Sequence, residues 1–266
     1  MTNKNQPVVS WLICCNSDNR KEISRTLQSI FDQKFNDHEI VFVSNGRDRD
    51  RIDRIVSEIA VDSPIRITGL RAATKGLTYS LNLGLQQCSG IYLARLDVGD
   101  VAAPNRLEIQ VPILNRGDRD YSGVGSQYRS LGGERSKISK LPLDSHSIAN
   151  GLWKTCTLCH PSMLLRVEAV RSVGGYGGFA HSEDFELWLR MTREGHQFVN
   201  VHDCLVDYEA SGGQARGNPR AYAGVVAYFF YEVLVAPRVR SVLGVVVYLA
   251  KFGLACLRHT KNRSYQ

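Results

Sequence analysis

The stretch that decides the fold is Lys75–Asp100, KGLTYSLNLGLQQCSGIYLARLDVGD. Its first leucines recur every four residues from Leu77 to Leu85, which is the spacing of one buried face of a helix. The apolar run Ile91–Leu96 then has the length of a buried strand, and it ends in the polar turn Asp97–Asp100. A helix leading into a buried strand is the repeating unit of an α/β fold with a mainly parallel sheet.

The residues before this stretch show the same alternation. Val8–Cys15 and Glu39–Ser44 are β-rich apolar runs, and a shorter third strand is expected at Ile65–Thr68. Apolar residues at helical spacing follow the first two runs, over Ile23–Phe31 and Ile52–Ile59. In open α/β sheets ligands bind beyond the carboxyl ends of the strands, so the turn after the fourth strand is expected to lie at the binding edge.

After Pro104 the alternation weakens. A helix is expected near Asn105–Leu114, and no element is predicted over the Gly-, Ser- and Lys-rich stretch Ser122–Lys140. Two apolar segments, Tyr222–Ala236 and Val242–Leu257, follow near the C-terminus. Each is interrupted by a charged residue and falls short of the roughly 18 to 20 apolar residues that a membrane-spanning helix needs, so they predict a helical hairpin at a membrane interface.

The basic charge of the chain is concentrated in this C-terminal part. The net charge is +7, yet residues 210–266 hold eight Lys or Arg side chains against one acid, Glu232, and residues 1–209 are balanced. A local cluster of this kind favours an anionic membrane surface as partner and argues against a nucleic-acid-binding fold.

The cysteines and the N-terminus indicate a cytoplasmic protein. Seven cysteines in a chain of 266 residues do not form the pattern of a disulfide scaffold, and the first apolar run is too short for a secretory signal. The Cys156–His160 segment matches the pattern for haem attachment, but haem or zinc is not favoured there, because that haem chemistry belongs to exported proteins and no second cysteine pair completes a zinc site. The glycine cluster Gly174–Gly178 predicts a mobile loop.

Two acidic motifs can carry chemistry. Asp97 and Asp100 can hold Mg²⁺ or Mn²⁺ that shares its other positions with substrate phosphates, although Asp and Gly also form ordinary turns. In SEDFELWLR, Ser182 is expected to cap a helix whose first turn carries Glu183 and Asp184, an arrangement that the helix dipole favours without any catalysis. Its buried stripe is expected to consist of Phe185, Trp188 and Leu189.

Taken in order, these pieces resemble the inverting glycosyltransferases of family 2 that build bacterial surface polysaccharides. The resemblance covers roughly residues 8 to 210 and rests on VSWLICCNS, EIVFVSNGRDRD, the stretch from KGLTYSLN to DVAAPNRLEIQ, HPSMLLR, GGYGG and SEDFELWLR. It implies the GT-A nucleotide-sugar-binding fold, a UDP-linked sugar donor and transfer with inversion. Residues 1–210 would form that domain, and residues 211–266 a basic helical segment associated with the membrane.

The resemblance also implies roles for individual residues. Asp184 would be the general base, Asp97 and Asp100 would hold the metal, and Glu183, Trp188 and His160 would lie in the acceptor region. Donor-binding positions would be Cys15, Asn16, Ser17, Asn45, Lys75, Arg95 and Asp97.

The chain departs from the family pattern at three places. Gly99 stands where relatives usually have a metal-binding acid, Ser44 and Asn45 replace an acidic pair, and Ser211 stands near a usual histidine. These departures leave open a metal-independent enzyme and a catalytically inactive protein that binds a sugar nucleotide or an assembly partner. A nucleotidyltransferase is a further alternative, but the loop that such enzymes have after the first strand is missing.

The expected activity is therefore transfer of a hexosyl or N-acetylhexosaminyl group to an acceptor at the cytoplasmic face of a membrane. A polyprenyl-linked saccharide suits both that location and the charge of the C-terminal segment.

Overall fold

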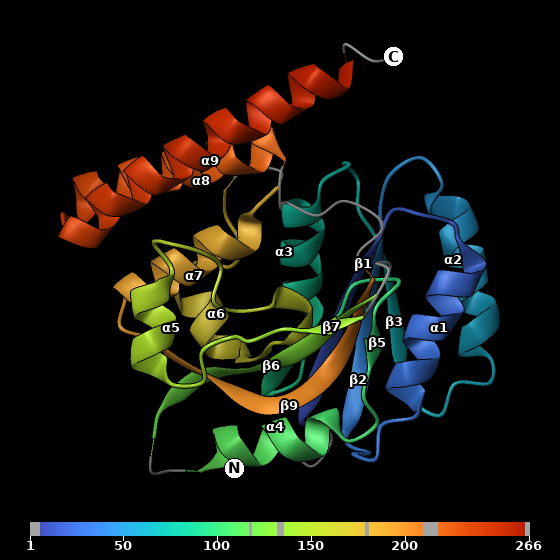
Figure 1. Cartoon of the computed structure of the whole chain (residues 1–266). Helices are drawn as coiled ribbons and strands as arrows, with labels where there is room; N and C mark the ends of the chain where they lie inside the picture. Colours follow the sequence, from blue (N-terminus) through green and yellow to red (C-terminus); the bar gives the residue numbers. More distant parts are fainter. Residues whose placement is uncertain (1–5, 117–118, 132–135, 179–180, 210–217, 264–266) are drawn as a thin grey trace.

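The computed structural model describes residues 6–116, 119–131, 136–178, 181–209 and 218–263, with side chains as far as Arg258. Within these residues nine strands form one mixed sheet in the order β3-β2-β1-β4-β8-β6-β9-β5, with β7 paired to β6. Helices cover both faces of this sheet, and two C-terminal helices lie along one end of the molecule (Figure 1).

The first half of the sheet is parallel, as the sequence predicts. Strands β3, β2, β1 and β4 pair in parallel, and helices α1, α2 and α3 connect them. Side chains of β1 alternate between two cores: Trp11 packs with α1 and α2, whereas Leu12 packs with α3. The bounds are β1 Val9–Cys15, α1 Arg20–Phe31, β2 His38–Ser44, α2 Arg49–Ala60, β3 Ile67–Arg71, α3 Leu77–Gln87 and β4 Tyr92–Arg95.

The second half of the sheet mixes a long parallel pair, β6 with β9, with short antiparallel pairs, which the sequence pattern did not reveal. Strand β8 pairs antiparallel to both β4 and β6, and β5 pairs antiparallel to β9. The stretch without a predicted element contains the long strand β6, where Gly123 and Gly125 leave no room for a Cβ beside Leu165 and Asn200. The bounds are β5 Val101–Ala102, β6 Tyr121–Leu131, β7 Lys137–Ile138, β8 Leu164–Arg166 and β9 Gln197–Glu209.

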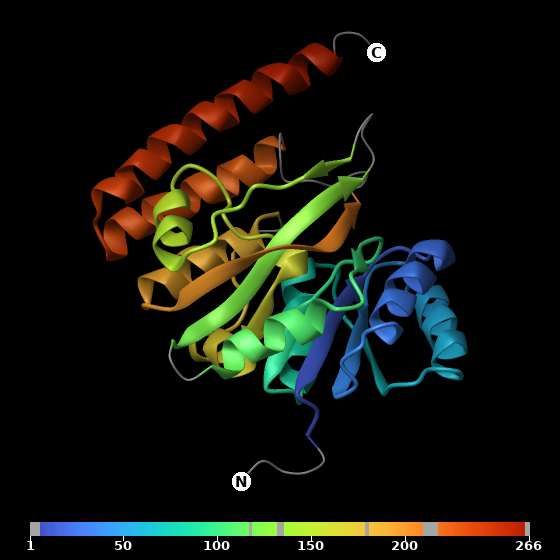
Figure 2. The same cartoon turned by 60° about the horizontal axis from the view of Figure 1, so that its bottom comes forward.

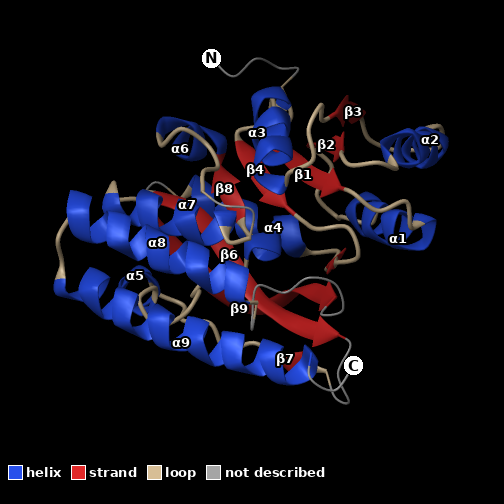
Figure 3. Cartoon of the chain, turned by 90° about the horizontal axis from the view of Figure 1, so that it is seen from above, coloured by secondary structure: helices blue, strands red, loops and turns tan. Residues whose placement is uncertain are grey.

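The remaining helices lie between and after these strands. Their bounds are α4 Arg106–Asn115, α5 Ser145–Gly151, the 3₁₀ turn η1 His160–Ser162, α6 Val167–Ser172, α7 Glu183–Arg193, α8 Pro219–Val235 and α9 Val239–Arg263. Helices α8 and α9 form an antiparallel hairpin, seen from above in Figure 3. Strand β1 begins on the side of the molecule away from the hairpin, so its carboxyl end points toward the hairpin side (Figures 1 and 2).

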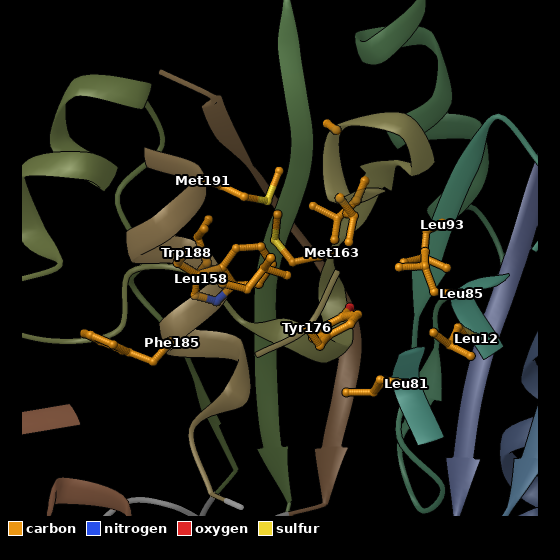
Figure 4. Close-up of a cluster of buried hydrophobic side chains, with 14 of the residues drawn as sticks. Leu12, Leu81, Leu85, Leu93, Leu158, Met163, Tyr176, Phe185, Trp188 and Met191 are labelled. Carbon is orange, nitrogen blue, oxygen red and sulfur yellow. The ribbon is translucent and has the colours of Figure 1, made fainter. Parts of the chain in front are cut away.

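The hairpin shares the larger hydrophobic core with the α/β part. That core gathers Leu12, Met163 and Trp188 between the sheet, α3 and α7 (Figure 4). Phe229 of α8 and Tyr248 of α9 belong to the same cluster. The inner side of the hairpin is therefore part of the folded core, and the predicted boundary at residue 210 lies outside the described residues.

The expectation that neither C-terminal segment is long enough to span a membrane was wrong for α9. Among the described residues, Val239–Arg258 is long and apolar enough to cross a bilayer, with a mean hydropathy of 1.7. The helix begins before the apolar run and continues past Lys251, so its length exceeds that of the uninterrupted run. Of an 18-residue window within this span, 28% is buried inside the structure.

Candidate active site

The carboxyl ends of β1 and β2 meet at one edge of the sheet. The Asn45 backbone N–H donates to the Cys15 carbonyl oxygen at 2.8 Å, and the Asn45 side-chain amide donates to Ser80 Oγ at 3.0 Å. Cys15 and Asn45 are buried, whereas Asn16 and Ser17 are exposed beyond the strand end. The four predicted donor-binding residues of this edge therefore lie close together, and Asn16 and Ser17 are accessible to a ligand.

A cavity of about 420 Å³ lies at the ends of β2 and β3. Its lining residues are Gly46, Arg47, Arg49, Ala72, Ala73, Thr74 and Lys75. Lys75 is exposed there, and Arg49 Nη1 donates to the Ala72 carbonyl oxygen at 3.1 Å. The cavity is thus positively charged and accessible, as an anionic nucleotide requires.

Arg95 is fully buried and orients the Asp97 carboxylate. Its Nη1 donates to the Leu12 carbonyl oxygen at 3.0 Å, and its Nη2 forms an ion pair with Asp97 Oδ1. Asp97 itself remains 41% exposed. Both residues are among the predicted donor-binding positions; Asp97 is accessible, whereas Arg95 is buried and can act only through its ion pair with Asp97.

The turn that follows requires a glycine. Gly99 has φ +105°, a conformation that side chains rarely adopt. Thr26 Oγ1 accepts a hydrogen bond from the Gly99 N–H at 2.9 Å and donates one to the Asp100 carbonyl oxygen at 2.8 Å. Arg25 also donates to the Gly99 carbonyl oxygen. The departure at position 99 therefore coincides with a tightly held turn.

Asp100 is a buried carboxyl group with one satisfied oxygen. Its Oδ1 accepts from the Glu209 N–H at 2.8 Å, because β9 returns beside the turn, and its Oδ2 has no hydrogen-bond partner in the described structure. Burial, and then the charge of Asp97, raises the pKa of Asp100 to about 8.

The two carboxylates fit a cation that is completed by phosphate. The unpaired Asp100 Oδ2 and the accessible Asp97 are hard oxygen ligands of the kind that Mg²⁺ and Mn²⁺ take. Over the described ranges no group of three or more His, Cys, Asp or Glu side chains could hold a metal, so the remaining ligands would come from substrate and water. Ser211 lies outside the described residues.

The start of α7 is strained, and the predicted side-chain cap is absent. His181 and Ser182 have φ values of 147° and 111°, and Ser182 makes no side-chain capping bond. Ser182 Oγ is buried without a hydrogen-bond partner in the described structure, and Glu183 Oε2 accepts from the Ser182 N–H at 3.1 Å. Strained residues of this kind cluster at functional sites.

Asp184 is a half-buried carboxyl group at this helix start. Its Oδ1 accepts from the Phe185 N–H at 2.8 Å. Burial, followed by the charge of Glu183, raises the pKa of Asp184 to about 7, and Asp97 also contributes to the rise. Asp184 thus lies within electrostatic reach of the donor-side turn, with a pKa suited to a general base at neutral pH.

The other residues predicted for the acceptor region lie deeper. Trp188 is fully buried, and His160 Nε2 is 3.0 Å from the Tyr176 hydroxyl oxygen and packs against the Trp188 ring. Burial, and then the Arg95 charge, holds the pKa of His160 well below its usual value. Both rings therefore support α7 from the core and present no surface to an acceptor, and Glu183 is also buried.

Several structural supports of the site were not singled out from the sequence. Arg106 is fully buried, donates to the carbonyl oxygens of Arg95, Pro161 and Met163, and lies over the Trp11 ring. An arginine at the start of an apolar helix after a proline was the available signal, but nothing in it distinguishes a buried guanidinium from an exposed one.

The glycine cluster is pinned, so the prediction of a mobile loop was wrong. Arg190 donates to the Val173 and Gly175 carbonyl oxygens, and the Asn82 side chain makes two hydrogen bonds with the Tyr176 backbone. These hydrogen bonds hold Tyr176 where its hydroxyl oxygen lies within hydrogen-bonding distance of His160 Nε2.

The cysteines make no disulfide. All seven are free, and burial raises the pKa of both Cys156 and Cys159 above the usual thiol value. The pKa values of these two thiols therefore lie further above neutral pH than that of an exposed cysteine.

Comparisons with known proteins agree with this geometry. The family described as Glycosyl transferase family 2 matches residues 11–174. The chain is 27% identical over 236 residues to the O-antigen biosynthesis glycosyltransferase WbnJ of Escherichia coli, covering 87% of this chain and 91% of the relative. It is also 27% identical over 220 residues to the UDP-Gal:alpha-D-GlcNAc-diphosphoundecaprenol beta-1,3-galactosyltransferase of Escherichia coli, covering 79% of this chain and 78% of that relative.

Solved structures show the same fold at low sequence identity. Residues 1–349 of S. aureus TarS in complex with UDP-GlcNAc align with a TM-score of 0.68 and 13% identity, over 91% of this chain and 72% of that one. The mannosyltransferase PcManGT from Pyrobaculum calidifontis in complex with GDP-Man and Mn²⁺ aligns with a TM-score of 0.67 and 16% identity, over 99% of this chain and 77% of that one. The chain therefore belongs to glycosyl transferase family 2 and is a glycosyltransferase with the GT-A fold.

Proposed function

We propose that this glycosyltransferase moves a hexosyl or N-acetylhexosaminyl group from a UDP-sugar to a polyprenyl-linked saccharide, with inversion at the anomeric carbon. The observation that carries the proposal is the position of Asp184, whose pKa of about 7 is raised in part by the donor-side Asp97. A carboxylate with this pKa can accept a proton at neutral pH.

In the proposed reaction Asp184 removes the proton of the acceptor hydroxyl group while that oxygen attacks the anomeric carbon. The new carbon–oxygen bond forms on the face opposite the diphosphate, and the bond to the diphosphate oxygen breaks with its electron pair leaving on UDP. The proton remains on the Asp184 carboxyl group. A single displacement of this kind needs one base and no covalent enzyme intermediate.

The remaining site residues would hold the donor. The nucleoside would lie at the joined ends of β1 and β2, beside Asn16, Ser17 and Asn45, with Lys75 close by. Asp97 and Asp100 would hold Mg²⁺ or Mn²⁺, and the ion would supply positive charge for the departing diphosphate. Arg95 would keep Asp97 oriented toward that position.

Names of similar proteins support the choice of substrates. TarS has been solved with UDP-GlcNAc, and one relative is named for a UDP-linked donor and a diphosphoundecaprenol-linked acceptor. Relatives named for O-antigen and amylovoran biosynthesis support a place in surface polysaccharide assembly. We further propose a cytoplasmic enzyme held peripherally at the membrane by residues 211–266, with residues 1–210 as the catalytic part.

The proposal is tested by incubating the purified protein with UDP-Glc, UDP-Gal, UDP-GlcNAc, UDP-GalNAc and GDP-Man, each with lipid-diphosphate monosaccharides, and measuring nucleoside diphosphate release. We expect release from at least one UDP-sugar and none from GDP-Man. Release from GDP-Man alone would overturn the UDP assignment. Parallel assays with EDTA and with added Mn²⁺ test the cation. We expect that EDTA, by removing the divalent cation, lowers turnover of the donor.

A further inference from the structure

We propose that helix α9 lies flat on an anionic bilayer through one exposed apolar face and does not cross it, although its length and composition would permit crossing. This inference rests on the proposed membrane-linked acceptor for its biological purpose, but the contacts that carry it are independent of catalysis. They concern the two opposite faces of α9.

The outer face of α9 is a continuous apolar stripe. Its exposed side chains follow one another at spacings of one, three or five residues, and at about 100° per residue these spacings keep them on one side of the helix. We define the lipid face as Val239, Val242, Leu243, Val246, Leu249 and Leu254. Val246, at the middle of the stripe, is 60% exposed, so this is a large apolar surface that neither α8 nor the α/β part covers.

The charges around the lipid face select an anionic surface. Arg238 and Arg240 flank its N-terminal end and Arg258 its C-terminal end, and all three are exposed. The one acid of the hairpin, Glu232, is buried and forms an ion pair with Arg193 of α7. An apolar face bordered by arginines, with the acid turned inward, is the arrangement of helices that lie in the interface of a negatively charged membrane.

The inner face of α9 is committed to the folded core, which argues against crossing. Gly244 lies directly on Phe229 of α8, where an added Cβ would overlap the ring. Tyr248 stacks on Phe229 with ring centroids 5.5 Å apart, and it contacts Phe185 of α7 edge to face, also at 5.5 Å. Lys251 donates to the Lys154 carbonyl oxygen. A helix crossing the bilayer would lose these contacts or drag the α/β part into lipid.

The same contacts place the catalytic helix next to the membrane. Phe185 follows Asp184 directly, so the aromatic contact of Tyr248 lies one residue from the proposed base. When α9 is embedded to a depth of about 5–10 Å, one layer of helices separates the start of α7 from the lipid. A saccharide joined to a membrane lipid through a diphosphate would then reach Asp184 from the edge of the hairpin.

Membrane binding is tested by flotation of the full-length protein with liposomes of phosphatidylcholine and phosphatidylglycerol, without substrate. The wild type is expected to float with liposomes rich in phosphatidylglycerol and to remain mostly at the bottom with pure phosphatidylcholine. Val246→Glu should reduce the floated fraction at least fivefold. Val61→Glu is the matched control, because Val61 is an 81% exposed valine at the end of α2, and it should float as the wild type does. If Val246→Glu floats as well as Val61→Glu does, the proposal that the lipid face binds the bilayer is wrong.

Depth separates a flat helix from a crossing one. Tryptophan introduced at Val239→Trp and at Leu249→Trp should be quenched to a similar degree, and most strongly by lipids brominated near the headgroup. A crossing helix would instead place position 249 near the bilayer centre, where deep bromines quench, and leave position 239 near the surface. That result would overturn the flat orientation. Because neither measurement uses donor or acceptor, failure of the proposed reaction would leave both readouts unaffected.

Discussion

Individual carboxyl groups with raised pKa values characterise the candidate active site. Asp184 and Asp100 are held where burial and neighbouring acids raise their pKa values to about 7 and about 8. Ionising them in the folded protein is therefore less favourable than in water. Sites arranged in this way trade folding stability for reactivity.

The pH dependence of the reaction follows from the Asp184 pKa. The base must be ionised to accept a proton, so kcat/KM should rise with pH through about 7 and then level off. Asp203→Asn, which removes an exposed acid on β9, should leave the profile unchanged. A rate independent of pH between 5 and 8 would argue against a base with this pKa.

The same pKa predicts a stabilising substitution. The folded pKa lies above the ordinary aspartate value of about 3.9, so the folded protein binds a proton that the unfolded chain releases between these values, and stability is lost as pH rises through that window. Asp184→Asn should therefore raise Tm at pH 8, by about 2–4 °C for each kcal/mol relieved. Thermal unfolding at pH 8 and pH 4 checks this, because the gain should vanish at the lower pH.

Sequence reasoning at the residue scale recovered positions better than environments. The acids at 97, 100 and 184 were singled out because motifs retain residue type, and their roles in metal binding and catalysis stay predictions. The burial of Trp188 was predicted from its helical spacing, whereas the burial of Arg95 and His160 was not, because it depends on strands and helices distant in the sequence that cover them. The backbone of Ser182 was also missed, since an αL conformation at a serine has no sequence signature.

At the scale of elements, buried polar contacts join α4 to the sheet. Arg106 satisfies three carbonyl oxygens from β4 and the η1 turn, and burial lowers its pKa to about 9. Arg106→Met should lower the free energy of unfolding by at least about 3 kcal/mol, because the Arg95 and Pro161 carbonyl oxygens lose the Arg106 donor, whereas Met163 keeps the Arg95 N–H. Arg116→Met, at an exposed arginine just after the same helix, should change it by less than about 0.5 kcal/mol in urea unfolding.

The packing of α9 on α8 predicts opposite effects for two glycines of one helix. Gly244→Ala should destabilise the protein, because the new Cβ would overlap Phe229, whereas Gly253 has no atom within 4 Å of an added Cβ. Gly253→Ala should be neutral or stabilising by up to about 1 kcal/mol, since alanine favours the helix. Unfolding midpoints in urea measure both, and equal effects would contradict the observed face of α9.

The elements themselves were predictable to unequal degrees. The first four strands and three helices repeat a strong local pattern, and their bounds fall close to those expected, except that β3 lies two to three residues further along. Strand β6 was missed, because its glycines are required by close contacts with Leu165 and Asn200, and no local sequence pattern indicates these contacts. The extent of α9 was underestimated, since Lys251 interrupts the apolar run without ending the helix.

At the scale of the whole molecule, the hairpin cannot be removed without exposing core. Phe229 and Tyr248 pack in the same cluster as Leu187 and Trp188 of α7. A chain shortened to end near residue 211 would leave that surface bare, so substitutions on the outer face test membrane binding more cleanly than truncation does. The hairpin is thus both the proposed membrane contact and a support for α7, the helix that carries the proposed base.

The proposed reaction depends on Asp184 as the base of a UDP-sugar transferase. The most direct measurement compares UDP release and donor affinity for the wild type and Asp184→Asn at pH 8, with a lipid-diphosphate saccharide acceptor. We predict that UDP release by Asp184→Asn is at least about 100-fold lower than that of the wild type, while UDP-sugar binding and folding are retained. A variant that keeps wild-type release would contradict it.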